Sequence, residues 1–128
     1  MTTSGRQYID LPNKSAELPF HDAVLANGTL YLSGRIGFEP ETRKIPAEPE
    51  QEARYLLEQI QEVLREAGMT MDDLVQVQIF CSDVSLFERF NRVYGGYFKR
   101  ELPARAFLGS GPLLFGARFE MMGIAVKR

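Results

Sequence analysis

The sequence has few of the residues that build disulfides, metal centres and histidine-dependent active sites. Its 128 residues include one cysteine, one histidine and no tryptophan. A single cysteine cannot form a disulfide within the chain, which fits a reducing compartment. One histidine and one cysteine are also too few for a zinc site built from the usual ligands. We therefore expect no metal and no disulfide framework.

Long apolar runs and an excess of positive charge are also missing. No segment approaches the roughly 20 apolar residues that span a bilayer, and segment 1–19 lacks the continuous apolar stretch of a secretory signal. The formal net charge of −2 at pH 7 counts against non-specific binding to nucleic acid or to an anionic membrane. We expect a cytoplasmic protein with neither partner.

What the sequence does contain is the composition of an ordinary globular domain, with 45% hydrophobic and 25% charged residues. No repeat or low-complexity tract divides the chain, and the cluster of Pro, Gly and charged residues at 37–49 indicates a surface loop. Residues 1–128 are therefore interpreted as one domain.

The first half of the chain predicts a hairpin followed by a helix. Asn27-Gly28 separates two apolar runs, and this dipeptide favours a type I′ turn between strands at 22–26 and 29–34. Apolar residues then recur with a helical period from 53 to 67. Pro49 suits the start of this helix, and Gly68 suits its end.

The second half predicts a strand, a helix and two more strands. In "DLVQVQIFCSD" the alternation indicates a strand with one face covered by a helix, formed by Val75, Val77, Ile79 and Cys81. The helix "VSLFERFNRVYGGYFKR" is capped by Asp83 or Ser85, and close backbone packing would explain its glycine pair. Strands at about 104–109 and 117–127 follow, and "QYIDL" suggests an extra N-terminal strand.

This order, ββαβαββ, predicts an α+β fold with two helices on one face of a mixed sheet. The other face is not fully polar, since Leu74, Phe80 and Met122 are assigned to it. In so small a domain, such a face suggests burial against other subunits.

Four polar residues lie in apolar surroundings and are candidates for a site: Ser33, Asn91, Arg105 and Glu120. Ser33 either lines a cavity or finishes a turn, and Asn91 shares an apolar helix face where its amide needs hydrogen-bond partners. The remaining features favour structural roles. His21 is interpreted as structural or surface, Cys81 as an inert buried thiol, and "GSGP" at 109–112 as a turn.

Arg105 raises the sharpest question, because an unpaired buried guanidinium is very costly. One possibility is an internal salt bridge, with Glu120 as the partner. The other is that a ligand supplies the anion, since the planar guanidinium suits two-pronged binding of a carboxylate. The residues alone leave both open.

Several separated motifs resemble the YjgF-like family of reactive intermediate deaminases, formerly called L-PSP endoribonucleases. They are "LPFHDAVLANGTLYLSGRIGFEPET", "NRVYGGYF", "LPARA" and "FEMMGIAVKR", in the family's order over residues 17–128. The resemblance implies a chorismate mutase-like fold and a homotrimer with sites in the clefts between subunits. It also implies hydrolysis of enamines and imines, such as 2-aminoacrylate and its 2-imino tautomer, to 2-oxo acids and ammonia. Neither a metal nor an organic cofactor is implied.

The resemblance also assigns roles to residues. It implies that Arg105 binds the substrate carboxylate and that Glu120 holds the attacking water. It also places Ser33, Asn91 and Phe20 beside the substrate. The chain departs from the family's pattern at Phe20, where a tyrosine is common, at Arg35 and Gly37, and through the segment 106–117. These departures bear on the shape of the pocket.

Two other functions stay open beside a 2-iminobutanoate/2-iminopropanoate deaminase-like hydrolase. The altered segment and Phe20 favour a non-catalytic module that binds a small carboxylate or a partner protein in the same clefts. RNA cleavage, the family's older label, is disfavoured by the negative charge and by the lack of a histidine pair for acid–base catalysis.

Overall fold

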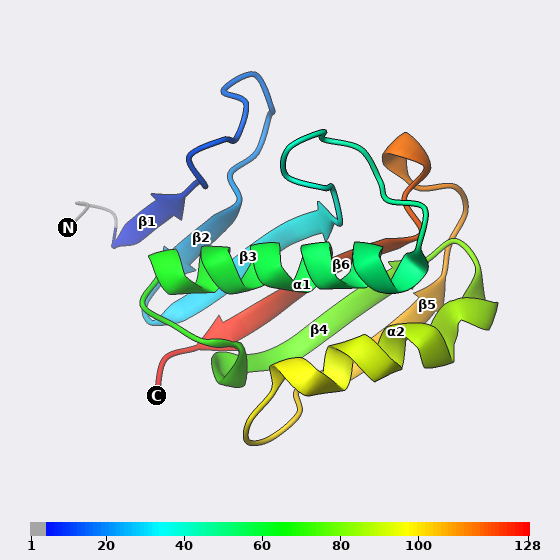
Figure 1. Cartoon of the computed structure of the whole chain (residues 1–128). Helices are drawn as coiled ribbons and strands as arrows, with labels where there is room; N and C mark the ends of the chain where they lie inside the picture. Colours follow the sequence, from blue (N-terminus) through cyan, green and yellow to red (C-terminus); the bar gives the residue numbers. More distant parts are fainter. Residues whose placement is uncertain (1–4) are drawn as a thin grey trace.

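One six-stranded sheet, with two helices on the same face, forms the computed structural model, which describes residues 5–128 (Figure 1). The strands are β1 (Arg6–Ile9), β2 (Ala23–Ala26), β3 (Thr29–Ile36), β4 (Leu74–Cys81), β5 (Ala104–Gly109) and β6 (Phe119–Val126). The helices are α1 (Pro49–Glu66) and α2 (Phe87–Tyr94), with short 3-10 helices η1 (Met71–Asp73), η2 (Val84–Leu86), η3 (Gly95–Tyr97) and η4 (Leu114–Gly116). The predicted α+β class and element order are confirmed.

The spatial order of the strands is β1-β2-β3-β6-β4-β5. β4 and β5 run parallel, and the other neighbouring strands run antiparallel. The connection from β4 to β5 passes through α2, as a parallel pair requires. β5 is consequently an edge strand that lies under α2.

The hairpin and the first helix are confirmed. Asn27 and Gly28 have φ angles of 51° and 79°, the left-handed values that a type I′ turn needs. Pro49 opens α1, and Gly68, with φ of 75°, follows its end. The apolar stripe of α1 is buried against the sheet, as its period predicts.

The side-chain pattern of β4 differs from the prediction at the start of the strand. Leu74 is only 4% exposed and belongs to the core, whereas Val75 is 48% exposed. The register of β4 against β6 shifts between Leu74 and Gln76, and this irregularity exchanges the faces of the two residues. Val77, Ile79 and Cys81 lie in the core as predicted.

The second helix is shorter than predicted. Asp83 does cap a helical turn, because its side chain accepts a hydrogen bond from the Ser85 amide, but that turn is η2. α2 ends at Tyr94, and Gly95-Gly96 begin η3. Close packing does not explain this pair, since a Cβ added at either glycine would meet nothing within 4 Å. The pair marks the end of the helix instead.

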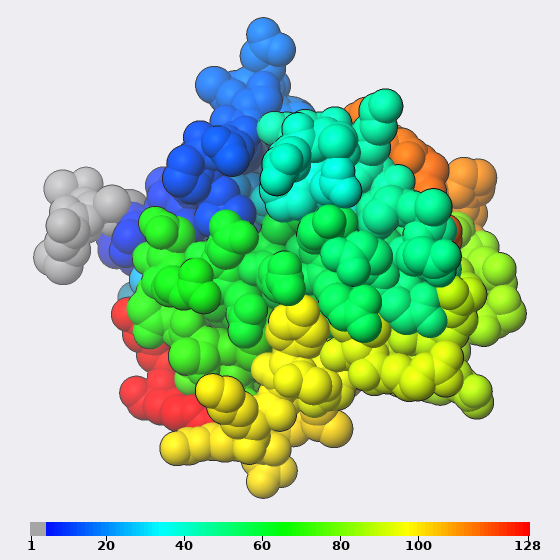
Figure 2. Space-filling model, in the orientation of Figure 1, coloured from blue at the N-terminus to red at the C-terminus, as the bar shows by residue number. Residues whose placement is uncertain are grey.

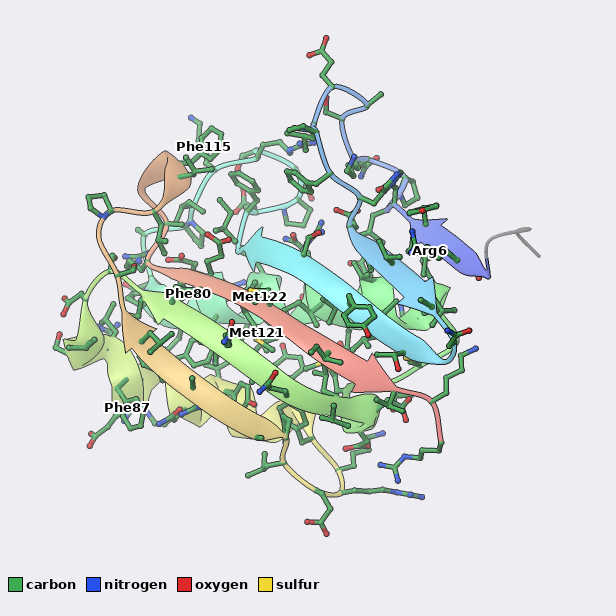
Figure 3. The ribbon with its side chains drawn as sticks, turned by 180° about the vertical axis from the view of Figure 1, so that it is seen from behind. Arg6, Phe80, Phe87, Phe115, Met121 and Met122 are labelled. Atoms are coloured by element: carbon green, nitrogen blue, oxygen red, sulfur yellow. The ribbon has the colours of Figure 1, made fainter. Side chains whose placement is uncertain are left out.

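The sheet face opposite the helices is apolar and uncovered within the described chain (Figure 3). It carries Phe80 beside Met122, and further exposed apolar residues there are Tyr31 and Val126. Phe80 and Met122 were assigned to this face from the sequence, and Leu74 was assigned to it wrongly. No helix within residues 5–128 has the length and apolar character needed to cross a membrane.

Candidate functional site

Arg105 lies on β5 and points toward the helices, because it is in register with the buried Val77 of β4. Its guanidinium carbon lies 4.8 Å from the ring centre of Tyr94, 5.4 Å from that of Phe107 and 5.6 Å from that of Phe87. Aromatic faces attract a guanidinium, and the attraction is stronger where water is excluded. The three rings therefore hold this cation in a fixed place at the sheet edge.

Asn91 contributes the polar contact to this guanidinium. Its side-chain oxygen accepts a hydrogen bond of 2.8 Å from Arg105 Nη1, so α2 and β5 are joined through these residues. The Asn91 amide thus finds the hydrogen-bond partner that its position requires in another side chain. Within residues 5–128, no carboxylate lies within ion-pair distance of Arg105. We call Phe87, Asn91, Tyr94, Arg105 and Phe107 the arginine cluster.

Tyr94 adds an unusual polar group to the arginine cluster. Its hydroxyl is buried and has no hydrogen-bond partner among the described residues. Burial raises the pKa of Tyr94 to about 12, although the positive charge of Arg105 acts in the opposite direction. The hydroxyl therefore stays protonated at neutral pH and is free to donate.

Glu120 lies on the opposite face of the sheet from Arg105. On β6 it is in register with Phe80, while its neighbours Phe119 and Met121 point into the core. An internal salt bridge between Arg105 and Glu120 is thus excluded, because the sheet separates them. The Glu120 side chain lies across Gly34, where an added Cβ would fall 2.1 Å from its Oε2 atom.

Ser33 adjoins Gly34, across which Glu120 lies, and a hydrogen bond links Ser33 to the backbone next to Phe20. Ser33 directly precedes Gly34, and its hydroxyl donates a 2.6 Å hydrogen bond to the carbonyl of His21, the residue after Phe20. Phe20 is 46% exposed. We call Phe20, Ser33, Gly34 and Glu120 the glutamate cluster. The candidate residues thus form two groups, and one chain does not bring them together.

A network that sequence reasoning missed supports the glutamate cluster. Arg35 donates to Asp22 at 3.1 Å and to Gln59 of α1 at 3.0 Å. Asp22, only 6% exposed, also accepts from the Leu11 amide at 2.7 Å. Both Arg35 contacts are thus structural. Because Asp22 balances the guanidinium, this departure from the family pattern introduces no unpaired positive charge.

His21 lies at the exposed end of this network. Its Nδ1 is 2.9 Å from a carboxylate oxygen of Asp10, whose other oxygen accepts from the Asp22 amide. The hydrogen bond with His21, followed by that with the Asp22 amide, lowers the pKa of Asp10. Because these bonds tie the chain at residues 21 and 22 to Asp10, His21 has a structural role.

A second missed feature is the ion pair of Glu52 and Arg118. Glu52 is fully buried at the start of α1 and accepts from Arg118 Nε at 2.7 Å, as well as from the amides of Arg118 and Phe119. Arg118 also donates to the carbonyls of Pro46 and Ala47. Glu52 precedes the buried Leu56 by four residues, a spacing that places it on the apolar face. This spacing was the sequence signal that could have identified Glu52 as a buried residue.

Gly37, another departure from the family pattern, belongs to this region. A Cβ at Gly37 would fall 2.1 Å from the backbone oxygen of Glu52. The chain directly after β3 thus approaches the start of α1 so closely that only glycine fits.

Metal and thiol chemistry has little support in the described chain. Within residues 5–128, no group of three or more His, Cys, Asp or Glu side chains could hold a metal ion. Cys81 is buried, its thiol lies 3.0 Å from the carbonyl of Asp83, and burial raises the pKa of the thiol. A thiol in this state is a poor nucleophile.

Comparison with known proteins defines the family. A family model described as Endoribonuclease L-PSP matches residues 12–127, which is most of the chain. The chain belongs to the YjgF/Rid family. Its relatives include a RutC family protein of Aquifex aeolicus, 34% identical, covering 85% of this chain and 89% of that protein. A Bos taurus protein named 2-iminobutanoate/2-iminopropanoate deaminase is also 34% identical, over 85% of this chain and 80% of its own.

A solved structure extends the Rid comparison to three dimensions. The Yersinia pestis protein YyfA, described as a member of the conserved Rid family, superposes with a TM-score of 0.89 at 34% identity. The match covers 95% of this chain and 99% of that protein. The resemblance expected from the motifs is therefore confirmed for the family and for the fold.

Proposed function

We propose that this Rid-family protein is a hydrolytic deaminase that converts small 2-imino acids and their enamine tautomers to 2-oxo acids and ammonia. The observation that carries the proposal is that Arg105 lacks an anionic partner among the described residues. Its cation is held by three aromatic rings and one neutral amide, with no carboxylate among the described residues to balance it. A substrate carboxylate would supply the missing anion. The Bos taurus relative is named for this reaction.

The two clusters enter one site only if different copies of the chain supply them. Arg105 lies on an edge strand, and Glu120 lies on the uncovered apolar face. A homotrimer that buries this face would place the arginine cluster of one copy opposite the glutamate cluster of the next. The small-molecule site would then be a cleft between subunits. We expect light scattering at micromolar concentration to give about three times the mass of one chain.

The proposed chemistry uses the two clusters for different tasks. Arg105 binds the substrate carboxylate with two parallel hydrogen bonds, and Asn91 fixes the orientation of the guanidinium. This directs the carbon of the C=N bond toward a water held by Glu120. As the water oxygen bonds to that carbon, Glu120 accepts a water proton. Glu120 returns this proton to the nitrogen, which gives the tetrahedral carbinolamine. Transfer of the carbinolamine hydroxyl proton to the same nitrogen, again through Glu120, breaks the C–N bond, so that ammonia leaves and the C=O bond of the 2-oxo acid forms.

The experiment that tests this function follows the decay of 2-iminopropionate. A serine dehydratase generates the imine, and its disappearance is recorded with and without this protein at micromolar concentration. We expect clear acceleration, and an Arg105→Ala variant is expected to lose about 100-fold in kcat/KM. Arg100→Ala is the matched control, because Arg100 is an exposed arginine whose backbone, not its side chain, is bonded to Asp72.

Two results would contradict the proposal. If imines from several amino-acid precursors decay at their spontaneous rate in the presence of the protein, the protein is not such a deaminase. If Arg105→Ala retains full activity in a trimer, the role given to Arg105 is wrong. The control variant should match the unaltered protein in both respects.

A second candidate function is a non-catalytic module that binds small carboxylates in the same cleft. It is favoured by the exposed apolar residues of the divergent segment, where Leu114 and Phe115 are 72% and 75% exposed. Thermal stabilisation by 2-oxo acids, lost in Arg105→Ala, without any acceleration of imine decay would support this function over hydrolysis.

A further inference from the structure

A cavity outside both clusters lies between the loop at 37–48 and the divergent segment that contains η4. Figure 1 shows η4 beside this loop at one end of the sheet, and Figure 2 shows the loop on the surface of the same region. The cavity has a volume of about 420 Å³, and its main lining residues are Arg43, Lys44, Ile45, Pro46, Phe115 and Arg118. Small-molecule sites have volumes of roughly 300–1,000 Å³. The cavity is thus large enough for a compact organic ligand.

The charge around this cavity is positive. No acidic residue is among those that line it in the described chain. The Lys44 ammonium makes no ion pair and no hydrogen bond within residues 5–128, and Arg43 donates only a long bond of 3.4 Å to the Asn13 carbonyl. Arg118 is balanced by Glu52, and its side-chain nitrogens donate to Glu52 and to two backbone carbonyls, so it adds no net charge to the cavity. An anion would therefore find two uncompensated cations here.

An aromatic ring, that of Phe115, forms the main part of the apolar wall of the cavity. Phe115 is 75% exposed, and its ring meets that of Phe38 edge-on at 5.4 Å between centres. Figure 3 shows Phe115 on the η4 segment, away from Phe80 and Met122 on the sheet face. Phe38 fixes one edge of the ring, while most of its surface stays open to a partner. Planar rings stack well on such a surface.

The backbone supplies an independent reason to assign a role to these side chains. Within residues 5–128, the non-glycine residues with positive φ are Asn27, Arg43 and Phe115. Asn27 occupies a hairpin turn, where asparagine is well suited. Arg43 and Phe115, with φ of 61° and 60°, adopt a conformation that is unfavourable for their residue types, and both line this cavity. Glycine would fit each backbone better, so the sequence retains these side chains at an energetic cost.

The geometry points to a second binding site, specific for a small aromatic anion. A planar ring would stack on Phe115, and a phosphate or carboxylate on that ligand would bind Arg43 and Lys44. No residue of the arginine cluster or of the glutamate cluster lines this cavity. Within one chain the site is therefore separate from both clusters.

Isothermal titration calorimetry with four probes tests the assignment. Adenosine monophosphate and benzoate each combine a ring with an anion, adenosine offers the ring alone, and inorganic phosphate offers the anion alone. We expect one or both of the aromatic anions to bind measurably, at least about tenfold tighter than adenosine or phosphate. Binding should weaken as the salt concentration rises.

Variants locate the binding site. Phe115→Gly removes the ring while relieving the backbone, so it should fold normally and lose about tenfold in affinity. Lys44→Gln should lose a similar factor by removing one cation. Leu102→Gly and Lys99→Gln are the matched controls, since both residues are exposed and neither lines the cavity. The controls should bind as the unaltered protein does.

Two results would overturn the assignment. One is the absence of binding by both aromatic anions. The other is binding that survives Phe115→Gly and Lys44→Gln but disappears in Arg105→Ala, because that pattern places the ligand in the arginine cluster. Binding retained in Arg105→Ala and weakened in the two cavity variants supports the second site. This result does not depend on whether imines are hydrolysed.

Discussion

Two arginines of this chain, Arg105 and Arg118, are held in opposite ways. Arg118 meets a buried carboxylate, Glu52, and two backbone carbonyls, so its charge and its donors are satisfied inside the chain. Arg105 meets three aromatic rings and one amide, with no carboxylate among the described residues. The first arginine joins the chain directly before β6 to α1. The second has no anionic partner among the described residues, which is what its proposed role in substrate binding requires. A buried or half-buried guanidinium thus indicates structure or function according to where its counter-ion lies.

The strongest test of this contrast removes Glu52. Glu52→Ala leaves Arg118 and the amides of Arg118 and Phe119 without their acceptor, in a place that water reaches poorly. We expect the free energy of unfolding to fall by about 4 kcal/mol, measured by urea denaturation. Glu62→Ala is the control, because Glu62 is exposed on the same helix. An equal, small loss of unfolding free energy in both variants would show that the buried pair stabilises the fold no more than a surface carboxylate does.

Replacing each arginine by leucine compares the two regions directly. Arg118→Leu leaves Glu52 buried and uncompensated, so a loss of about 3 kcal/mol is expected. Arg105→Leu leaves only the Asn91 amide without a donor, so the loss should be about 1 kcal/mol or less. The rate of imine decay should show the opposite order, because Arg105→Leu should be inactive and Arg118→Leu should keep more of the activity. If Arg105→Leu proves the less stable of the two in urea denaturation, its guanidinium is mainly structural.

Two glycines extend the comparison from charges to backbone. An added Cβ at Gly37 meets the backbone oxygen of Glu52 at 2.1 Å, and one at Gly34 meets the Glu120 carboxylate at the same distance. Backbone at a helix start cannot yield, so Gly37→Ala should cost about 2 kcal/mol. A partly exposed side-chain carboxylate can move, so Gly34→Ala should cost about 1 kcal/mol or less.

Activity distinguishes the same two glycine variants. Gly34→Ala displaces the carboxylate that the proposed mechanism needs, and kcat/KM should fall by about tenfold or more. Gly37→Ala, assayed well below its melting temperature, should retain most of its activity. A fully active Gly34→Ala variant would argue against a role for Glu120 in its present position.

The smallest effect is expected at the surface ion pair of Arg89 and Glu50, which joins α2 to α1. Arg89 donates to Glu50 at 2.8 and 2.7 Å, and this contact lowers the pKa of Glu50 to about 2 from the ordinary 4.5. Because the pKa is lowered in the folded state, the stabilisation is present above pH 4.5 and is lost as the pH falls toward 2.

Glu50→Gln measures this contribution. Its stability deficit relative to the unaltered protein should be small at pH 7, should shrink at high salt and should vanish between pH 4.5 and 2. Thermal unfolding across this range gives the measurement. A deficit that is constant with pH would mean that the pair is not the source of the difference.

Local sequence signals predicted the secondary structure well where one physical cause dominates. Asn27-Gly28 and the apolar period of α1 gave correct elements, because turn conformation and helix amphipathicity are local properties. The assignment of Leu74 and Val75 to faces was wrong, since a register shift against β6 depends on the partner strand. The Gly95-Gly96 pair was assigned to a helix interior, although it lies at the helix end.

The sequence by itself determined the family, the α+β element order and the presence of Arg105 and Glu120 as polar residues in apolar strands. Only the tertiary structure decided that these two lie on opposite faces of the sheet and cannot pair within one chain. It also revealed the Glu52–Arg118 pair, whose members are far apart in the sequence. The physical reason is the same in each case: periodicity shows which face of its own strand or helix a residue occupies, whereas its charge partner depends on how distant segments pack.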